Sequence, residues 1–281
     1  MPRPTLPCAR NWDCGSTKPG HHRCDLHKLP LMVYRLLTLL TLVFSLLFSA
    51  LLPAQGLTVQ PYNPSNLTNG VLLGLGGALT TTSVMLDRRV SPLTEEDVAI
   101  LDFEVVPKID RFSLRHLSLD ADEFTDKLLL ASFASPFFLL LDRPGRQNFD
   151  RMALIVFQGA MINSGLINLT KVLVRRPRPY TYNSDAPLDT KLKKSSRYSF
   201  FSGHSATTAY FALTAAKLYN DLHPQSNARP YVWLGAALLP AAVSYGRMRA
   251  GRHFFTDVLV GTAVGTIIAL TVPSLHKTGG E

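Results

Sequence analysis

Five apolar segments of helical length lie between residues 128 and 275 and constrain the fold more than any other feature. None of them alternates polar and apolar residues with the period of two that a half-buried strand shows, and they are longer than ordinary strands. We therefore predict an all-α protein, a helical bundle of about five to six core helices. The segments are residues 128–141, 152–170, 205–216, 230–246 and 258–275.

The hydropathy of these segments leaves two environments open. A membrane span needs about 20 apolar residues, several segments are shorter, and the mean hydropathy of the chain is only +0.11. Gln158, Asn163 and Asn168 also lie inside one of them. However, stretches such as VGTAVGTIIAL have the small-residue faces of packed membrane helices. We expect a membrane-embedded bundle, with a soluble periplasmic protein as the alternative.

The N-terminal part of the sequence reads as a targeting segment. Residues 1–31 are rich in Pro, Cys, His and Arg and show no period. Met32 then opens a segment with a basic residue, an apolar run over residues 36–52 and small residues at a plausible cleavage position. This order is typical of a secretory signal peptide. We expect the signal peptide at residues 32–56, Met32 as the true start, and residues 1–31 as a non-native extension.

The three cysteines, Cys8, Cys14 and Cys24, all lie in this N-terminal extension, with three histidines nearby. Their spacing fits no standard zinc pattern, so we predict no metal site here. No cysteine follows Cys24, so the body of the protein has no disulfide of its own.

Residues 57–126 precede the catalytic domain that we expect at 127–275. They contain an apolar, glycine-rich segment, 71–86, followed by a charged amphipathic region that we expect outside the membrane. Thr94 with Asp97 three residues later is a variant of the capping box and predicts a helix start. We expect residues 71–86 to be re-entrant or to pack on the bundle without crossing the membrane.

Three polar motifs lie where the predicted helices end or begin. The first runs from Lys171 to Pro179 and leaves the end of the second apolar segment; the second, Phe201-Ser-Gly-His204, opens the third; the third, from Arg247 to Asp257, joins the last two. All three therefore reach the same end of the bundle, where we expect the active site. Phosphoryl transfer requires cations around the non-bridging oxygens, and Lys171, Arg178 and Arg247 supply them.

The remaining motif residues suit binding and bond making. Ser202 and Gly203 precede a predicted helix, whose N-terminus offers free N–H groups to an anion. His253 and Asp257 are four apart, so on a helix they share a face, and the carboxylate can hold one ring nitrogen protonated while the other attacks phosphorus. His204 is then free to protonate the leaving oxygen as a general acid. The predicted intermediate is a phosphohistidine at His253.

These motifs resemble the pattern of the type 2 phosphatidic acid phosphatase superfamily, which also includes bacterial class A acid phosphatases and vanadium haloperoxidases. That pattern is Lys, six residues, Arg-Pro; then Pro-Ser-Gly-His; then Ser-Arg, five residues, His, three residues, Asp. The likeness covers residues 120–275 and departs from the pattern at two positions. Phe201 replaces the proline, which is expected to loosen the turn, and Gly246 replaces the serine, which removes one phosphate hydrogen bond.

The resemblance implies a role for each matching residue. The implied phosphate ligands are Lys171, Arg178, Ser202, Gly203 and Arg247, the acid is His204, the nucleophile is His253 and its partner is Asp257. The resemblance implies a phosphatase that needs no metal and no cofactor. Its implied substrate is a phosphomonoester or a diphosphate, most often that of a membrane lipid. The alternatives are a soluble class A-like acid phosphatase and a non-catalytic phospholipid-binding relative.

Charge favours an anionic substrate. The net charge is +9, and basic residues cluster between Lys171 and Arg197, which suits anionic substrates or lipid headgroups. Nucleic acid is not expected, because the basic stretch lies between apolar helices and carries no recognisable binding motif. The arginines of residues 142–151 predict that this loop is cytoplasmic. We therefore expect a bacterial inner-membrane protein with its active site facing the periplasm.

Overall fold

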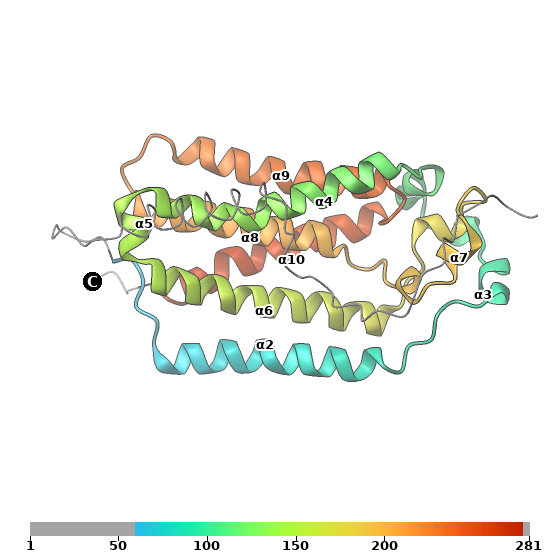
Figure 1. Ribbon diagram of the computed structural model, residues 1–281, viewed down its shortest axis with the longest axis horizontal. Helices are drawn as coiled ribbons and strands as arrows, with labels where there is room; N and C mark the ends of the chain where they lie inside the picture. Colours follow the sequence, from blue (N-terminus) through green and yellow to red (C-terminus); the bar gives the residue numbers. More distant parts are fainter. Residues whose placement is uncertain (1–59, 278–281) are drawn as a thin grey trace, which may run out of the picture. The chain divides into compact units, whose positions relative to one another are not determined.

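The computed structural model describes residues 60–277, and within them the regular elements are helices, apart from one isolated antiparallel bridge between Tyr62 and Lys277. The all-α prediction is confirmed. Six of the helices in this part of the chain have 16 or more residues, which agrees with the expected five to six core helices (Figure 1). They are α2 (Asn66–Asp87), α4 (Leu119–Ala134), α6 (Phe149–Val174), α8 (Gly203–Leu222), α9 (Arg229–Arg249) and α10 (Phe255–Ser274).

Each of the five predicted apolar segments lies in one of these helices. The first corresponds to α4 and the 3-10 helix η3 (Ser135–Leu141) that continues it. However, α4 begins at Leu119, where Ser118 caps it by accepting a hydrogen bond from the amide of Ala121. The domain boundary expected after residue 126 therefore falls inside this helix. The first two turns of α4 carry side chains that contact the motif residues, as described below.

Short helices connect the long ones. Thr94 caps α3 with the predicted capping box: its hydroxyl accepts from the amide of Asp97 at 3.1 Å, and its amide donates to the Asp97 carboxylate at 3.0 Å. This local prediction is confirmed. The short elements are α3 (Glu95–Ala99), η1 (Phe103–Val105), η2 (Lys108–Arg115), α5 (Arg143–Gln147), η4 (Pro179–Tyr182), α7 (Leu188–Lys191) and η5 (Lys194–Arg197).

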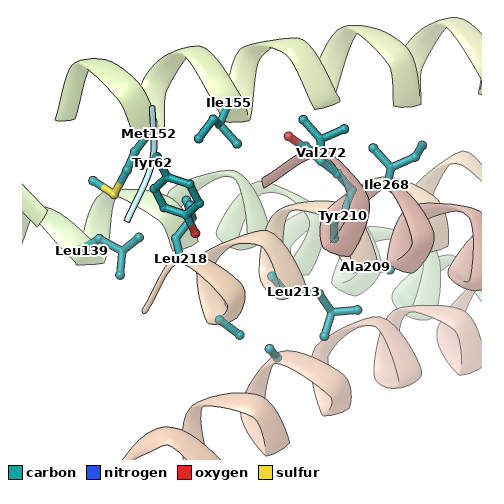
Figure 2. Packing of buried hydrophobic residues seen from close by; sticks show 14 of the residues in the cluster. Tyr62, Leu139, Met152, Ile155, Ala209, Tyr210, Leu213, Leu218, Ile268 and Val272 are labelled. Atoms are coloured by element: carbon teal, nitrogen blue, oxygen red, sulfur yellow. The ribbon is translucent and has the colours of Figure 1, made fainter. Parts of the chain in front are cut away.

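Helix α8 is the centre of the bundle, because it packs on α4, α6, α9 and α10. Tyr210 and Leu218 of α8 are completely buried and meet Ile155 of α6 and Val272 of α10 in the main apolar cluster (Figure 2). Glycines allow α10 to approach α8 closely: a Cβ on Gly265 would lie 2.1 Å from the carbonyl oxygen of Ala206. Such small-residue contacts let two helix backbones pack together.

Helix α2 corrects the expectation for residues 71–86. It is one continuous helix of 22 residues, so a re-entrant segment is wrong. The other expectation, that this segment packs on the bundle, is confirmed, because α2 lies along α6 (Figure 1). Gly76 meets Met161, and Gly165 of α6 meets Leu79, so the two helices run in the same direction. The sequence signal was incomplete because the first turn, Asn66 to Gly70, is polar and is fixed by the Ser65 cap.

Four stretches among residues 60–277 are long and apolar enough to cross a membrane: Asn66–Asp87, Leu119–Leu141, Phe149–Tyr182 and Phe255–Ser274. Their outward faces carry exposed large apolar side chains, such as Leu67, Leu130, Phe137 and Ile267. Exposed apolar surface of this extent suits a lipid environment better than water. These features indicate a membrane protein. The signal peptide and the extension expected at residues 1–56 lie outside the described residues.

Candidate active site

The three motifs meet at one end of the bundle, as their topology predicted. Lys171 lies in the last turn of α6, Ser202 is the N-cap of α8, and Arg247 lies in the last turn of α9. His253 lies in the connection from α9 to α10, and Asp257 is in the first turn of α10. Because α6 and α9 end where α8 and α10 begin, segments up to 86 residues apart in sequence come together (Figure 1).

The cations surround the buried imidazole of His253. After burial, the charges that lower the pKa of His253 most are those of Arg178, Arg247 and Lys171, followed by His204. The Lys171 ammonium also lies over Gly203, since a Cβ at that glycine would be 3.2 Å from its Nζ. A glycine at this position therefore leaves room for both the lysine and an anion. The structure thus brings together the residues for which the sequence predicted phosphate binding and bond making.

Several hydrogen-bond donors here are left for a ligand. Arg247 is buried and donates from Nη1 to Asp122 at 2.6 Å, while its Nε has no partner among the described residues. Arg178 donates from Nε to the carbonyl of Ser195 at 2.9 Å, and its two Nη groups make no hydrogen bond within residues 60–277. The Nε of Arg247 is buried, and a buried donor without a partner is costly. An oxyanion between the two guanidinium groups would satisfy them.

Ser202, the buried N-cap of α8, accepts two hydrogen bonds at its hydroxyl oxygen. Its Oγ accepts from the amide of Ser205 at 3.3 Å and from the hydroxyl of Ser205 at 3.0 Å. Ser205 in turn accepts from the hydroxyl of Ser244 at 2.9 Å. Because both bonds use the lone pairs of Ser202, its O–H remains free to donate to a phosphate oxygen. Hydroxyl chains of this kind polarise one another and strengthen the last donor.

A backbone carbonyl fixes the tautomer of the His253 imidazole. Its Nδ1 lies 2.7 Å from the carbonyl oxygen of Ser199. A carbonyl only accepts, so Nδ1 carries the hydrogen and the lone pair is on Nε2. Burial, followed by Arg178, Arg247, Lys171 and His204, holds the pKa of His253 well below its ordinary value. The ring is therefore neutral and able to attack phosphorus near neutral pH.

Asp257 acts on His253 less directly than the sequence suggested. Helix α10 begins at Phe255, so His253 precedes it and the two residues do not share a helical face. The Asp257 carboxylate lies 3.7 Å from Nδ1, beyond hydrogen-bond range, which makes the expected direct hydrogen bond wrong. Instead, Asp257 accepts from the Ser199 hydroxyl at 2.5 Å and from the Phe254 amide at 2.9 Å. It positions both neighbours of the imidazole.

Sequence reasoning missed the ion-pair network behind Asp257. Arg176 bridges Asp257 at 2.6 Å and the buried carboxylate of Asp110 at 2.7 Å, and its guanidinium stacks 3.9 Å from the centre of the Phe254 ring. Asp110 also accepts from the amide and the hydroxyl of Thr256. This network fixes η2 and the start of α10 to the first motif. The only signal for it was the position of Arg176 inside that motif.

Two carboxylates of α4 complete the site and were also missed. Asp126 lies 2.8 Å from Nε2 of His204, and Asp122 accepts from both Arg247 and Arg252. Burial and then Arg247 lower the pKa of His204 to about 4, while Asp126 acts in the opposite direction and raises it. Asp126 therefore favours the protonated form of the His204 imidazole.

The two departures from the family pattern have local compensation. A Cβ on Gly246 would lie 2.4 Å from the methyl group of Thr125, so no serine fits there. The Thr125 methyl group occupies this space, and the Thr125 hydroxyl accepts a hydrogen bond from Arg247 at 3.2 Å. Phe201 is buried beside Ile167, and the turn after it is fixed by a hydrogen bond from the Ser202 amide to the Asp257 carbonyl at 3.0 Å. The expected loosening of this turn is not seen.

Comparison with known proteins agrees with the motifs. Residues 152–280 match the sequence model of the PAP2 superfamily. Among solved structures, the chain is similar to the first transmembrane PAP2-type phosphatidylglycerolphosphate phosphatase from Bacillus subtilis, with 23% sequence identity, over 74% of this chain and 94% of that one, at a TM-score of 0.37. The resemblance predicted from the motifs is therefore confirmed for residues 152–280, the part that matches the PAP2 superfamily and that contains Lys171, His204 and His253.

Proposed function

We propose that this protein is a phosphatase that hydrolyses a phosphomonoester or diphosphate of a membrane lipid through a phosphohistidine. The observation that carries the proposal is the neutral imidazole of His253, whose free Nε2 lies among Lys171, Arg178 and Arg247. The match of residues 152–280 to the PAP2 superfamily supports phosphatase activity. The four apolar helices support a substrate that resides in a membrane.

The first chemical step forms a bond between Nε2 of His253 and phosphorus. The cations and the Ser202 hydroxyl hold the non-bridging oxygens while charge builds on them. The ester bond breaks as His204 donates its proton to the leaving oxygen. Asp126 and Asp257 act through the two imidazoles: Asp126 supports the proton on His204, and Asp257 holds Ser199, whose carbonyl orients His253.

The second step returns the enzyme to its starting state. His204, now neutral, takes a proton from water while the water oxygen attacks phosphorus. The bond to His253 breaks, orthophosphate leaves, and His204 is again protonated. Microscopic reversibility requires the acid of the first step to be the base of the second. No step draws on a divalent metal, because the fixed cations Lys171 and Arg178 of the first motif and Arg247 of the third are placed to neutralise the phosphate.

Phosphate release by the purified protein tests the function. We expect turnover of lipid phosphates in detergent micelles, inhibition by orthovanadate, and full activity in EDTA. His253→Ala should lower kcat on the order of 10³-fold or more, since removal of a nucleophile abolishes the covalent route. The matched control is His116→Ala, because His116 is the C-cap of η2 and lies outside the motifs. Equal turnover by the two variants would refute the proposal.

The membrane setting can be separated from the soluble alternative. A class A-like acid phosphatase would share the catalytic residues but would leave the membrane fraction on carbonate extraction. We expect this protein to stay in the membrane pellet, because the apolar side chains on α2, α4 and α10 are exposed. We further propose that the site faces the periplasm, at the end opposite the arginines of residues 142–151.

A further inference from the structure

The segment of residues 108–119, which contains η2 and leads into α4, has one face fixed to the active site. Asp110 is buried and accepts from Arg176 at 2.7 Å and from the amide of Thr256 at 2.9 Å. Ser113, three residues later, is also buried. Because side chains three apart eclipse each other on a 3-10 helix, these two residues define one inner face of η2. That face is held against the end of the bundle.

Large apolar side chains of the same segment are exposed. Ile109 and Phe112 are again three apart, so they share a second face of η2, and Leu117 follows before α4. Their exposed fractions are 61%, 42% and 37%. The basic side chains of Lys108 and Arg115, at the two ends of η2, are exposed as well. Exposed apolar residues accompanied by cations are typical of a surface that lies in the plane of a membrane interface.

Helix α9 gives the level of this segment relative to a membrane. No charged residue lies between Arg229 and Arg247 in the sequence, and Leu238 and Tyr245 are exposed on the outward side of the helix. Its 21 residues rise about 1.5 Å each, so α9 is roughly as long as the hydrocarbon core is thick. An exposed tyrosine followed one turn later by the exposed Arg249 is the order expected where a helix leaves that core.

The exposed side chains of η2 continue the outward surface of α9 at this level. The ring centres of Phe112 and Tyr245 are 6.5 Å apart. The amide of Ser118 donates to the carbonyl of Arg249 at 3.2 Å, so the end of the segment lies against the end of α9. The sequence indicated a region outside the membrane because charged residues interrupt its apolar ones. The structure separates the two, with Asp110 turned inward and the apolar side chains left outside.

We propose that Ile109, Phe112 and Leu117 form an interfacial face that lies in the headgroup region of the leaflet at the site end of the bundle. Its partner is the lipid surface, because the face is continuous with the outward surface of α9 and because Lys108 and Arg115 suit lipid phosphates.

The contact would hold the active site at the depth of the lipid phosphates. Asp110 on the inner face pairs with Arg176, and Arg176 pairs with Asp257, so the interfacial face is joined to the motifs through two ion pairs. The acids that face the same end are Asp120 and Glu123 of α4, both exposed, and Glu123 is paired with Lys127. The inference concerns the membrane and does not require phosphatase activity.

Nitroxide labels on single cysteines measure the depth of the interfacial face. The full-length protein, with its three cysteines changed to serine, is reconstituted into vesicles of phosphatidylcholine and phosphatidylglycerol. Ile109→Cys and Leu117→Cys are labelled separately, so that one still gives the answer if the other fails to fold. Oxygen concentrates in the bilayer and a nickel chelate in the water, so the ratio of their collision rates with the label reports its depth.

Two further positions calibrate this ratio. Asp189→Cys, exposed on α7 at the same end of the bundle, gives the value in water. Leu130→Cys, 71% exposed on α4, gives the value in the bilayer. We expect the ratios at Ile109→Cys and Leu117→Cys to lie between these two and to exceed that of Asp189→Cys several-fold.

Two results would overturn the interfacial face. Ratios at Ile109→Cys and Leu117→Cys equal to that of Asp189→Cys would place these side chains in water. Protection of both labels from oxygen and from the nickel chelate would mean that protein, and not lipid, covers them. Because neither result depends on turnover, the proposed phosphatase function is tested separately by phosphate release.

Discussion

Asp126 and His204 form the contact that most directly controls protonation in the site. The carboxylate lies 2.8 Å from the ring and raises the pKa of His204, against the effects of burial and Arg247. Lys171 also lowers this pKa, and Asp122 and His253 are charge-coupled to the same ring. The balance between these groups sets the pH range in which His204 can serve as an acid.

Asp126→Asn should therefore shift the alkaline limb of the kcat profile to lower pH. The reaction needs His204 protonated, and loss of the carboxylate lowers its pKa, so activity is lost at a lower pH, by roughly one unit. The effect should be larger for alkyl phosphates than for p-nitrophenyl phosphate, whose leaving group needs less protonation. Asp126→Glu should restore much of the profile.

Glu123→Gln is the matched control for this measurement. It removes the same charge from the same helix, but Glu123 pairs with Lys127 on the exposed face of α4. We expect its profile to match the wild type. If Asp126→Asn and Glu123→Gln shift the alkaline limb of the pH profile equally, then Asp126 acts only through the net charge of α4 and not through its contact with His204.

The residues that sequence alone revealed are those with short-range patterns. Ser202 could be recognised as a helix cap, and Thr94 with Asp97 as a capping box, because their contacts span three residues. Asp126 and Ser199 could not be recognised, since their partners lie 78 and 58 residues away. Their roles appear only when α4 and α10 are placed against the motifs. The helical face predicted for His253 and Asp257 was wrong because α10 starts later than the pattern suggested.

At the scale of elements, close packing of α10 on α8 holds the second and third motifs together. Gly261 faces the backbone of Ser202, and Gly265 faces the carbonyl of Ala206 one turn further along. A Cβ at Gly265 would lie only 2.1 Å from that oxygen, so the helices must separate to admit it. Separation would also move the Ser202 hydroxyl and His253 relative to each other.

Gly265→Ala should thus lower the free energy of unfolding by about 1–3 kcal/mol, the usual cost of overpacking. Gly235→Ala on α9 is the control, because nothing lies within 4 Å of its Cβ position. That change should be neutral or stabilise the protein by up to about 1 kcal/mol, since alanine favours helices over glycine. Thermal unfolding in detergent measures both, and equal stability of the two variants would argue against the close contact.

The element boundaries also show what composition could not reveal. Residues 71–86 looked too short to cross a membrane because the polar first turn of α2 hid its true length of 22 residues. Likewise, Asp122 and Asp126 made the start of α4 look like a surface region. In both cases polar residues near a helix end interrupt the apolar pattern: those of α2 belong to its capped first turn, and those of α4 contact the motif residues.

At the scale of the whole molecule, the direction of α2 constrains how the bundle is oriented in a membrane. Its first residues lie at the same end as the arginines of 142–151, because α2 runs parallel to α6 (Figure 1). If α2 crosses the membrane, residue 60 and that loop are on one side and the active site is on the other. A periplasmic site and cleavage of a signal peptide before residue 60 then exclude each other.

Labelling of single cysteines decides the orientation. In a protein with Cys8, Cys14 and Cys24 changed to serine, Asp189→Cys lies at the site end and Asp150→Cys at the arginine end, both exposed. We expect a membrane-impermeant maleimide to label Asp189→Cys on intact cells and Asp150→Cys only after lysis. The reverse pattern would place the site in the cytoplasm.

The covalent intermediate is the central claim and can be measured directly. The enzyme is mixed with a ³²P-labelled phosphate ester, quenched in alkali within milliseconds, and digested to locate the label. We predict acid-labile, alkali-stable phosphate on the peptide that contains His253, and none in His253→Ala. Label on another residue, or steady turnover by His253→Ala, would contradict the account.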